Sequence, residues 1–144
     1  MKREVIRPWP PMAEHNTPFV PAIKIPLPGA ALLFISGMGP LPPVHRHPHV
    51  PEEWDLPEDA AVQARRALDK IRKTVEAAGG EFRHIVKITR YLKDMRDQDR
   101  INEVIHEYFG EDLPTSTTVQ VVGFVAPTMK LEFDCWAVIP EEKR

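Results

Sequence analysis

The chain has 144 residues, of which 42% are hydrophobic and 28% charged, and its formal net charge is −2. This length suits a single domain over residues 1–144 with enough residues to bury a core. No apolar run approaches the roughly 20 residues of a membrane-spanning helix, and charges of both signs without a basic cluster argue against nucleic acid as a partner. One cysteine and no apolar stretch behind Met1–Glu4 lead us to expect a cytoplasmic protein.

Proline divides the chain, because 13 of its 16 prolines lie in residues 1–57. Proline fixes φ and lacks an N–H donor, so this part is predicted to form short strands joined by turns. Residues 30–37 are a clear strand, and residues 19–25 are expected to pair with it as a hairpin. Pro21 within residues 19–25 favours an edge position for that strand. Residues 38–57 are expected to form an exposed loop rich in histidine and proline.

Two amphipathic helices are predicted further along the chain. Residues 57–78 form the first: Pro57 and the acidic pair after it suit its first turn, and glycines 79 and 80 end it. Its apolar stripe recurs at spacings of three and four and consists of Ala64, Leu68, Ile71, Val75 and Ala78. The second helix begins at the cap Asp97 and ends at Gly110.

Three further strands complete the pattern. Residues 85–92 are rich in β-branched side chains, and residues 117–122 and 129–138 follow the second helix. The order β-β-α-β-α-β-β predicts an α+β fold with one mixed sheet and two helices on one face.

The last predicted strand alternates in character. Its odd-numbered residues are apolar and should pack under the helices. Its even-numbered residues place two carboxylates and an indole on the opposite face, as Glu132, Asp134 and Trp136. Because Trp136 and Val138 form apolar surface there, we expect another subunit to cover this face.

Several segments, in order and at the expected spacing, resemble the RidA (YjgF/YER057c/UK114) family over roughly residues 17–138. They are Leu33–Gly37, Gln63–Ile71, Val75–Gly80, Ile85–Met95, Ile101–Val104, Tyr108–Phe109, Thr117–Val121 and Leu131–Asp134.

The resemblance implies a chorismate-mutase-like subunit and a homotrimer with small-molecule clefts between its subunits. For the best-known branch it implies hydrolysis of reactive 2-imino and 2-enamino acids without metal or cofactor. Carried over by position, Ser36 and Gly37 match the pocket's serine-glycine pair, and Asn102 matches a pocket-side asparagine. Glu132 matches the glutamate that positions the attacking water.

Three positions depart from the family pattern. Ser116 stands where the main branch has an arginine that binds the substrate carboxylate, Phe19 replaces a tyrosine, and Met38 replaces a glutamine. Losing a bidentate arginine contact costs about 1.5–3 kcal/mol of binding. We therefore expect something other than a standard 2-imino-acid deaminase, with Ser116 and Thr118 offering neutral hydroxyls and Phe19 and Met38 an apolar wall.

Two functions follow as hypotheses. The first is a cofactor-free hydrolase or deaminase of an enamine-, imine- or amide-like metabolite, in which Glu132 positions water. The alternative is a non-catalytic trimer that binds or senses a small molecule, with Glu132 merely paired with Lys130 or with a neighbouring chain. RNA cleavage ranks last, because the chain has no basic stripe.

Three histidines at alternate positions, His45, His47 and His49, raise the question of a metal. In an extended strand alternate residues stand about 6.5 Å apart, too far to bind one ion without a turn, and Pro48 is a residue that could supply one. No cysteine, aspartate or glutamate lies in residues 44–50 to complete a ligand set. The expectation is therefore a metal-free loop that forms a lid or rim.

Overall fold

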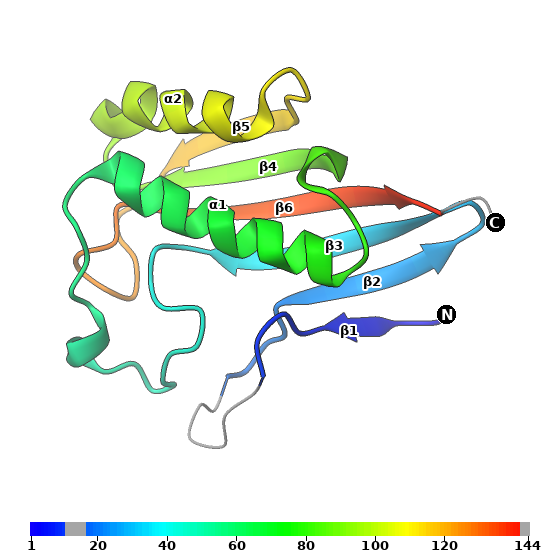
Figure 1. The fold of residues 1–144 in the computed structure, drawn as a ribbon. Helices are drawn as coiled ribbons and strands as arrows, with labels where there is room; N and C mark the ends of the chain where they lie inside the picture. The colour runs from blue at the N-terminus through cyan, green and yellow to red at the C-terminus, as the bar shows by residue number, and fades with distance from the viewer. Residues whose placement is uncertain (11–16, 142–144) are drawn as a thin grey trace.

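The computed structural model describes residues 1–10 and 17–141, which form one six-stranded sheet in the order β1-β2-β3-β6-β4-β5 (Figure 1). The strands are β1 (Glu4–Ile6), β2 (Ala22–Leu27), β3 (Ala30–Met38), β4 (Ile85–Leu92), β5 (Thr115–Gln120) and β6 (Leu131–Pro140). β4 and β5 are parallel and the other neighbours antiparallel. The predicted α+β class with a mixed sheet is confirmed.

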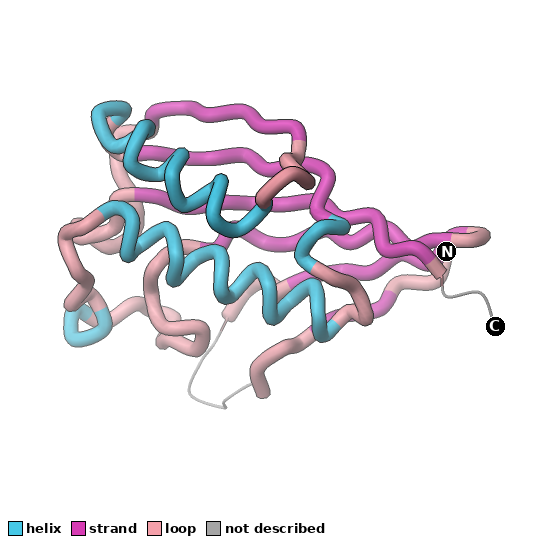
Figure 2. Tube along the Cα trace, turned by 45° about the horizontal axis from the view of Figure 1, so that its top comes forward, coloured by secondary structure: helices cyan, strands magenta, loops and turns pink. Residues whose placement is uncertain are grey.

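Two helices, α1 (Ala60–Ala77) and α2 (Gln98–Phe109), lie side by side over one face of the sheet (Figures 1 and 2). All five residues of the predicted α1 stripe are buried. The Asp59 side chain accepts from the Ala61 N–H at 2.8 Å, so Asp59 caps α1 and Pro57 precedes the helix instead of entering it. No helix in the described parts of the chain is long and apolar enough to cross a membrane.

The edge of the sheet differs from the prediction. β1 pairs with β2, so the expectation that the strand near Pro21 forms an edge is wrong. β1 has only three residues, too few to show the alternation that identifies a strand in sequence. β5 begins two residues earlier than expected and β6 two residues later.

The loop over residues 38–57 is less exposed than predicted. Leu41 and Leu56 are buried in a second small core with Ala126 and Met129. Between them lies the short 3-10 helix η1 (Pro51–Glu53). Two more such turns, η2 (Phe82–His84) and η3 (Met95–Asp97), precede β4 and α2. The loop is therefore anchored at both ends by apolar contacts.

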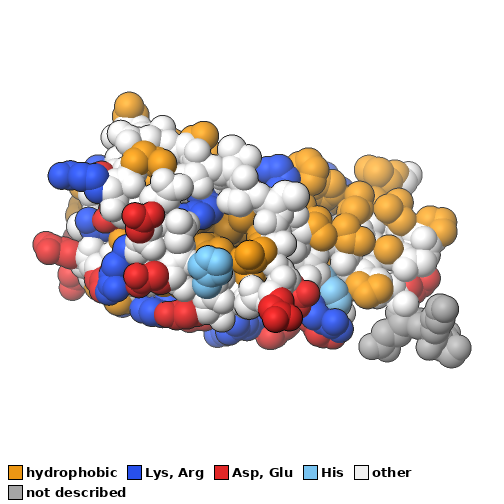
Figure 3. Space-filling view, turned by 90° about the horizontal axis from the view of Figure 1, so that it is seen from above, with side chains coloured by type: hydrophobic (Ala, Val, Ile, Leu, Met, Phe, Trp, Pro, Cys, Tyr) orange, Lys and Arg blue, Asp and Glu red, His pale blue; other side chains and the backbone are white. Residues whose placement is uncertain are grey.

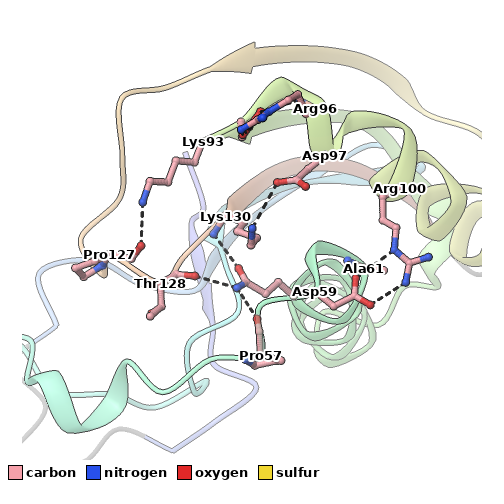
Figure 4. A network of polar contacts seen from close by, with 12 residues as sticks. Pro57, Asp59, Ala61, Lys93, Arg96, Asp97, Arg100, Pro127, Thr128 and Lys130 are labelled. Atoms are coloured by element: carbon pink, nitrogen blue, oxygen red, sulfur yellow. Dashed lines mark hydrogen bonds and ion pairs between the residues drawn. The ribbon is translucent and has the colours of Figure 1, made fainter.

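A buried glutamine joins the loop to the start of β6. Gln63 on α1 donates to the carbonyl oxygens of Pro57 at 2.8 Å and Thr128 at 2.9 Å, and its own oxygen accepts from the Lys130 N–H at 2.8 Å. Pro57, Thr128 and Lys130 lie close together in Figure 4. Because all three bonds serve backbone groups near the core, they fix the segments before α1 and before β6 relative to each other.

The face of the sheet away from the helices carries exposed apolar side chains. Phe34 and Trp136 are paired across β3 and β6, and their rings meet edge to face at 5.3 Å. Trp136 is 50% exposed and Val138 is 38% exposed. The predicted alternation of β6 is confirmed, since Leu131, Phe133, Cys135 and Ala137 are buried. Seen from above, hydrophobic side chains gather toward the right of Figure 3 and charged ones toward its left and lower edge.

Candidate functional site

A cavity of about 690 Å³ opens where the end of β3 meets the start of β6. Its walls also come from residues 17–21, the loop over residues 38–57, and α1 through Lys70. This volume lies in the range of small-molecule sites. The charged and titratable side chains that line it are Arg7, His45, His47, His49, Lys70 and Glu132.

Glu132 lies against the backbone of Gly37. A Cβ built on Gly37 would overlap the Oε1 atom of the Glu132 carboxylate. The β3–β6 register shifts between Ile35 and Met38, so the irregular part of β3 falls beside this carboxylate. Any other residue at position 37 would displace the Glu132 carboxylate, so this arrangement requires glycine. The serine-glycine pair and the glutamate predicted from sequence are thus brought together.

Lys70 is a site residue that the sequence reasoning missed. It projects from α1 into the cavity, and its Nζ donates to the Leu41 carbonyl at 2.9 Å. Burial lowers the pKa of the Lys70 amine to about 8, against the opposing charge of Glu132. One pattern in the sequence could have indicated Lys70. Spacings of four, three and four place it on one face of α1 with Gln63, Ala67 and Thr74.

Burial raises the pKa of the Glu132 carboxyl above its usual range, the charge of Lys70 lowers it, and the charge of Asp134 raises it again. Asp134 accepts a hydrogen bond from the Tyr91 hydroxyl at 2.9 Å. Lys130 lies 3.9 Å from Asp97. Among the described residues, Lys130 forms its ion pair with Asp97 and not with Glu132, and Lys70 is the cationic neighbour of Glu132.

The other predicted residues on this wall also line the cavity. Ser36 donates through Oγ to the Val20 carbonyl at 2.6 Å, which holds the hydroxyl in place. Met38 is buried, and Phe19 is half-exposed with its ring edge-on to that of His47, at 5.7 Å between centroids. These side chains give the cavity a partly apolar lining.

Asn102, Ser116 and Thr118 do not line this cavity. Asn102 lies on α2, and the other two lie on β5, which β4 separates from β6. A single chain therefore does not bring the two groups of predicted residues together.

A buried arginine lies beside Thr118. Arg90 pairs with Thr118 across the parallel β4–β5 ladder and is 6% exposed. Among the described residues, its Nε and Nη2 atoms find no hydrogen-bond partner. Burial lowers the pKa of this guanidinium. Sequence reasoning placed Arg90 within a strand and gave it no role.

The three histidines of the loop are much closer than an extended strand allows. The ligating atoms of His45, His47 and His49 all lie within 4.8 Å of one another. This part of the loop therefore turns back on itself, and the spacing of an extended strand does not apply to it. Burial lowers the pKa of His45, its hydrogen bond with the Pro42 carbonyl opposes this, and neighbouring positive charges lower it further.

The chain is similar in sequence to a known protein family and to proteins named as deaminases. Residues 12–139 match the family model described as Endoribonuclease L-PSP. The chain is 34% identical over 135 residues to the 3-aminoacrylate deaminase RutC of Acinetobacter baylyi, covering 92% of this chain and 94% of RutC. It is 34% identical over 91 residues to the 2-iminobutanoate/2-iminopropanoate deaminase of Escherichia coli, covering 61% of this chain and 70% of that enzyme.

The fold is similar to the crystal structure of PA3499 from Pseudomonas aeruginosa, a protein of unknown function. The TM-score is 0.76 at 29% identity, over 96% of this chain and 93% of PA3499. The matched segment covers most of the chain and contains the β3, β6 and α1 residues of the cavity. The chain therefore belongs to the Endoribonuclease L-PSP family, the family also called RidA or YjgF.

Proposed function

We propose that this protein is a deaminase that hydrolyses a reactive imine or enamine to a carbonyl compound and ammonia. The observation that carries the proposal is the Glu132 carboxylate, held against Gly37 inside the cavity with Lys70 as its charged neighbour. A half-buried carboxylate beside an amine is suited to moving one proton to and from water. The names of the two deaminase relatives support this class of reaction.

The reaction needs few groups. Glu132 accepts a proton from water as the water oxygen bonds to the imine carbon, and the electron pair of the C=N bond moves to nitrogen, which takes up that proton from Glu132. Glu132 then accepts the hydroxyl proton of the resulting carbinolamine as the C=O bond forms, and passes it to the nitrogen as the C–N bond breaks and ammonia leaves. Lys70 stabilises the ionised form of Glu132 before each of its two proton acceptances.

We further propose that the substrate is larger than a short 2-imino acid. A volume of about 690 Å³ suits a drug-sized molecule. Phe19 and Met38 offer apolar contact, as do other cavity residues such as Trp9, Leu41 and Val125. Ser116 at the expected carboxylate-binding position is a neutral donor and acceptor.

The complete site, in this proposal, belongs to a homotrimer. Exposed Phe34, Trp136 and Val138 form an apolar face that a second copy would cover. Asn102, Ser116 and Thr118 lie on β5 and α2, away from the cavity of their own chain. A neighbouring copy would bring these residues to the cavity opening.

The test is ammonia release from a panel of compounds, comprising 3-aminoacrylate, 2-iminobutanoate and larger aryl-substituted enamines. We expect turnover of the larger members, reduced about 10²- to 10⁴-fold in Glu132→Gln with ligand binding retained. Glu76→Gln on the exposed side of α1 is the matched control and should leave turnover unchanged.

Each failure has its own meaning. Ligand binding without turnover of any compound would favour the non-catalytic binding trimer. Turnover of 2-iminobutanoate at the rate of the larger enamines would overturn the substrate proposal alone. Full activity in Glu132→Gln would overturn the role of the carboxylate.

A further inference from the structure

The loop over residues 38–57 gathers three imidazoles in the wall of the cavity. The ring centroids of His45, His47 and His49 are 4.4 to 5.3 Å apart, and their ligating atoms all lie within 4.8 Å of one another. Two nitrogens bound to one tetrahedral zinc at about 2.0–2.1 Å stand roughly 3.3 Å apart. The observed spacing is therefore within reach of small rotations of the rings.

His45 is held in an orientation that suits metal binding. Its Nδ1 lies 2.9 Å from the carbonyl oxygen of Pro42. A carbonyl only accepts, so Nδ1 carries the hydrogen in this contact and the lone pair of the neutral ring belongs to Nε2. Metal-bound histidines commonly donate their other N–H in this way, which fixes the ring and its tautomer.

The loop itself is tied down on both sides of the histidines. The Arg46 N–H donates to the Glu53 carboxylate at 3.0 Å, within the loop. Leu41 and Leu56 are buried in the second small core. The Phe19 ring packs edge-on against that of His47. The three imidazoles are thus presented by an anchored segment, which reduces the entropy lost when an ion is bound.

We propose that His45, His47 and His49 bind one divalent transition-metal ion such as zinc, with its open coordination position facing the cavity. Three histidines and an exchangeable fourth ligand form a known arrangement of zinc sites that bind water or substrate. All three side chains line the same cavity as Glu132.

The donor set indicates the class of metal. Imidazole suits zinc, copper, nickel and iron, whereas magnesium and calcium require oxygen ligands. Among the described residues, this cluster contains no carboxylate. The ion would bind an oxygen or nitrogen of a cavity ligand, or a water molecule, as a Lewis acid.

The proposal is independent of the deaminase activity, because it is tested by binding alone. Untagged protein, freed of metal by a chelator, is titrated with Zn²⁺ by calorimetry and with Co²⁺ by visible absorption. We expect one ion per chain at the site and a Co²⁺ spectrum of tetrahedral type. X-ray absorption at the zinc edge should count three imidazole ligands.

Substitutions separate this site from surface histidines. His47→Ala should weaken Zn²⁺ binding about tenfold or more, and the triple alanine variant should abolish it. His106→Ala on the exposed side of α2 should leave binding unchanged. His47→Asn, with circular dichroism, checks that the loss reflects the ligand and not the fold.

Binding that survives the triple substitution would overturn the site, as would a zinc-edge spectrum with fewer than three imidazoles. Absence of binding at micromolar free Zn²⁺ would overturn it as well.

Discussion

Gly37 and Glu132 share one space: the carboxylate of Glu132 lies where the side chain of any other residue at position 37 would begin. The contact joins β3 to β6 at the point where their register shifts. The position of the proposed catalytic carboxylate therefore depends on the absence of a Cβ atom at position 37.

Gly37→Ala should reduce turnover strongly without unfolding the protein. The added methyl group displaces the carboxylate, and a misplacement of about 1 Å can cost about 10²-fold in rate. The measurement is kcat on the best substrate, together with the thermal midpoint. Gly123→Ala is the control, since a Cβ there meets open space. Equal activity in both variants would show that the Glu132 position is not critical.

Lys70→Met should change how stability depends on pH. The pKa of Lys70 is lowered to about 8 in the folded protein, against about 10.4 in an unfolded chain. Between these values the unfolded state binds more protons, so stability rises with pH from about 8 to about 10.4. Urea unfolding at intervals across this range should show the rise in the wild type and its loss in Lys70→Met. Lys73→Met, at an exposed position on α1, should behave like the wild type.

Asp134→Asn should shift the acid limb of the pH profile of kcat/KM to lower pH. Asp134 contributes a like charge that raises the pKa of Glu132, and the asparagine removes that charge while it can still accept from the Tyr91 hydroxyl. A rate loss with no displacement of the limb would instead indicate a purely structural effect.

Trp136→Lys should convert the proposed homotrimer to monomers. The indole is half-exposed in the single chain and pairs with Phe34 on the open face of the sheet, where a desolvated charge would be costly. Light scattering after gel filtration gives the mass directly. Val122→Lys, at a fully exposed apolar residue beyond β5, is the comparison. An unchanged mass in Trp136→Lys would remove the support for a covered face.

Arg90→Met should stabilise the isolated fold. The Nε and Nη2 donors of Arg90 are buried without acceptors among the described residues, and such unpaired donors cost about 1–3 kcal/mol. We expect the free energy of unfolding, from urea denaturation, to rise by about 1 kcal/mol or more. Arg66→Met, an exposed position on α1, should change it little. A destabilised Arg90→Met would indicate that a ligand or neighbouring copy supplies the acceptors.

Local periodicity accounts for what the sequence could predict. The α1 stripe and the alternation of β6 follow from a spacing of 3.6 and of 2 residues, and both were identified. Gly37 and Glu132 required the family pattern, since nothing local connects residues on different strands. The short β1 was missed because three residues carry no recognisable period.

The residues that line the cavity could not be predicted from local sequence patterns, because their positions depend on tertiary packing. Lys70 resembles the other cations of α1, and only the packing of the 38–57 loop turns it into a buried amine. The approach of His45 to His49 depends on how that loop folds back, which alternation in an extended strand misrepresents. Ser116 is predicted as a departure from the family pattern, but its separation from Glu132 within one chain follows only from the order of the strands.

Gln63 separates the position of β6 from the length of the loop before α1. Its amide joins the backbone before α1 to the backbone before β6. The end of the loop at Pro57 is therefore held in place whatever the length of the loop. Insertions or deletions among residues 42–50 would then leave β6, which carries the proposed catalytic Glu132, in place. Changes in this part of the cavity wall can alter the proposed substrate preference without moving that carboxylate.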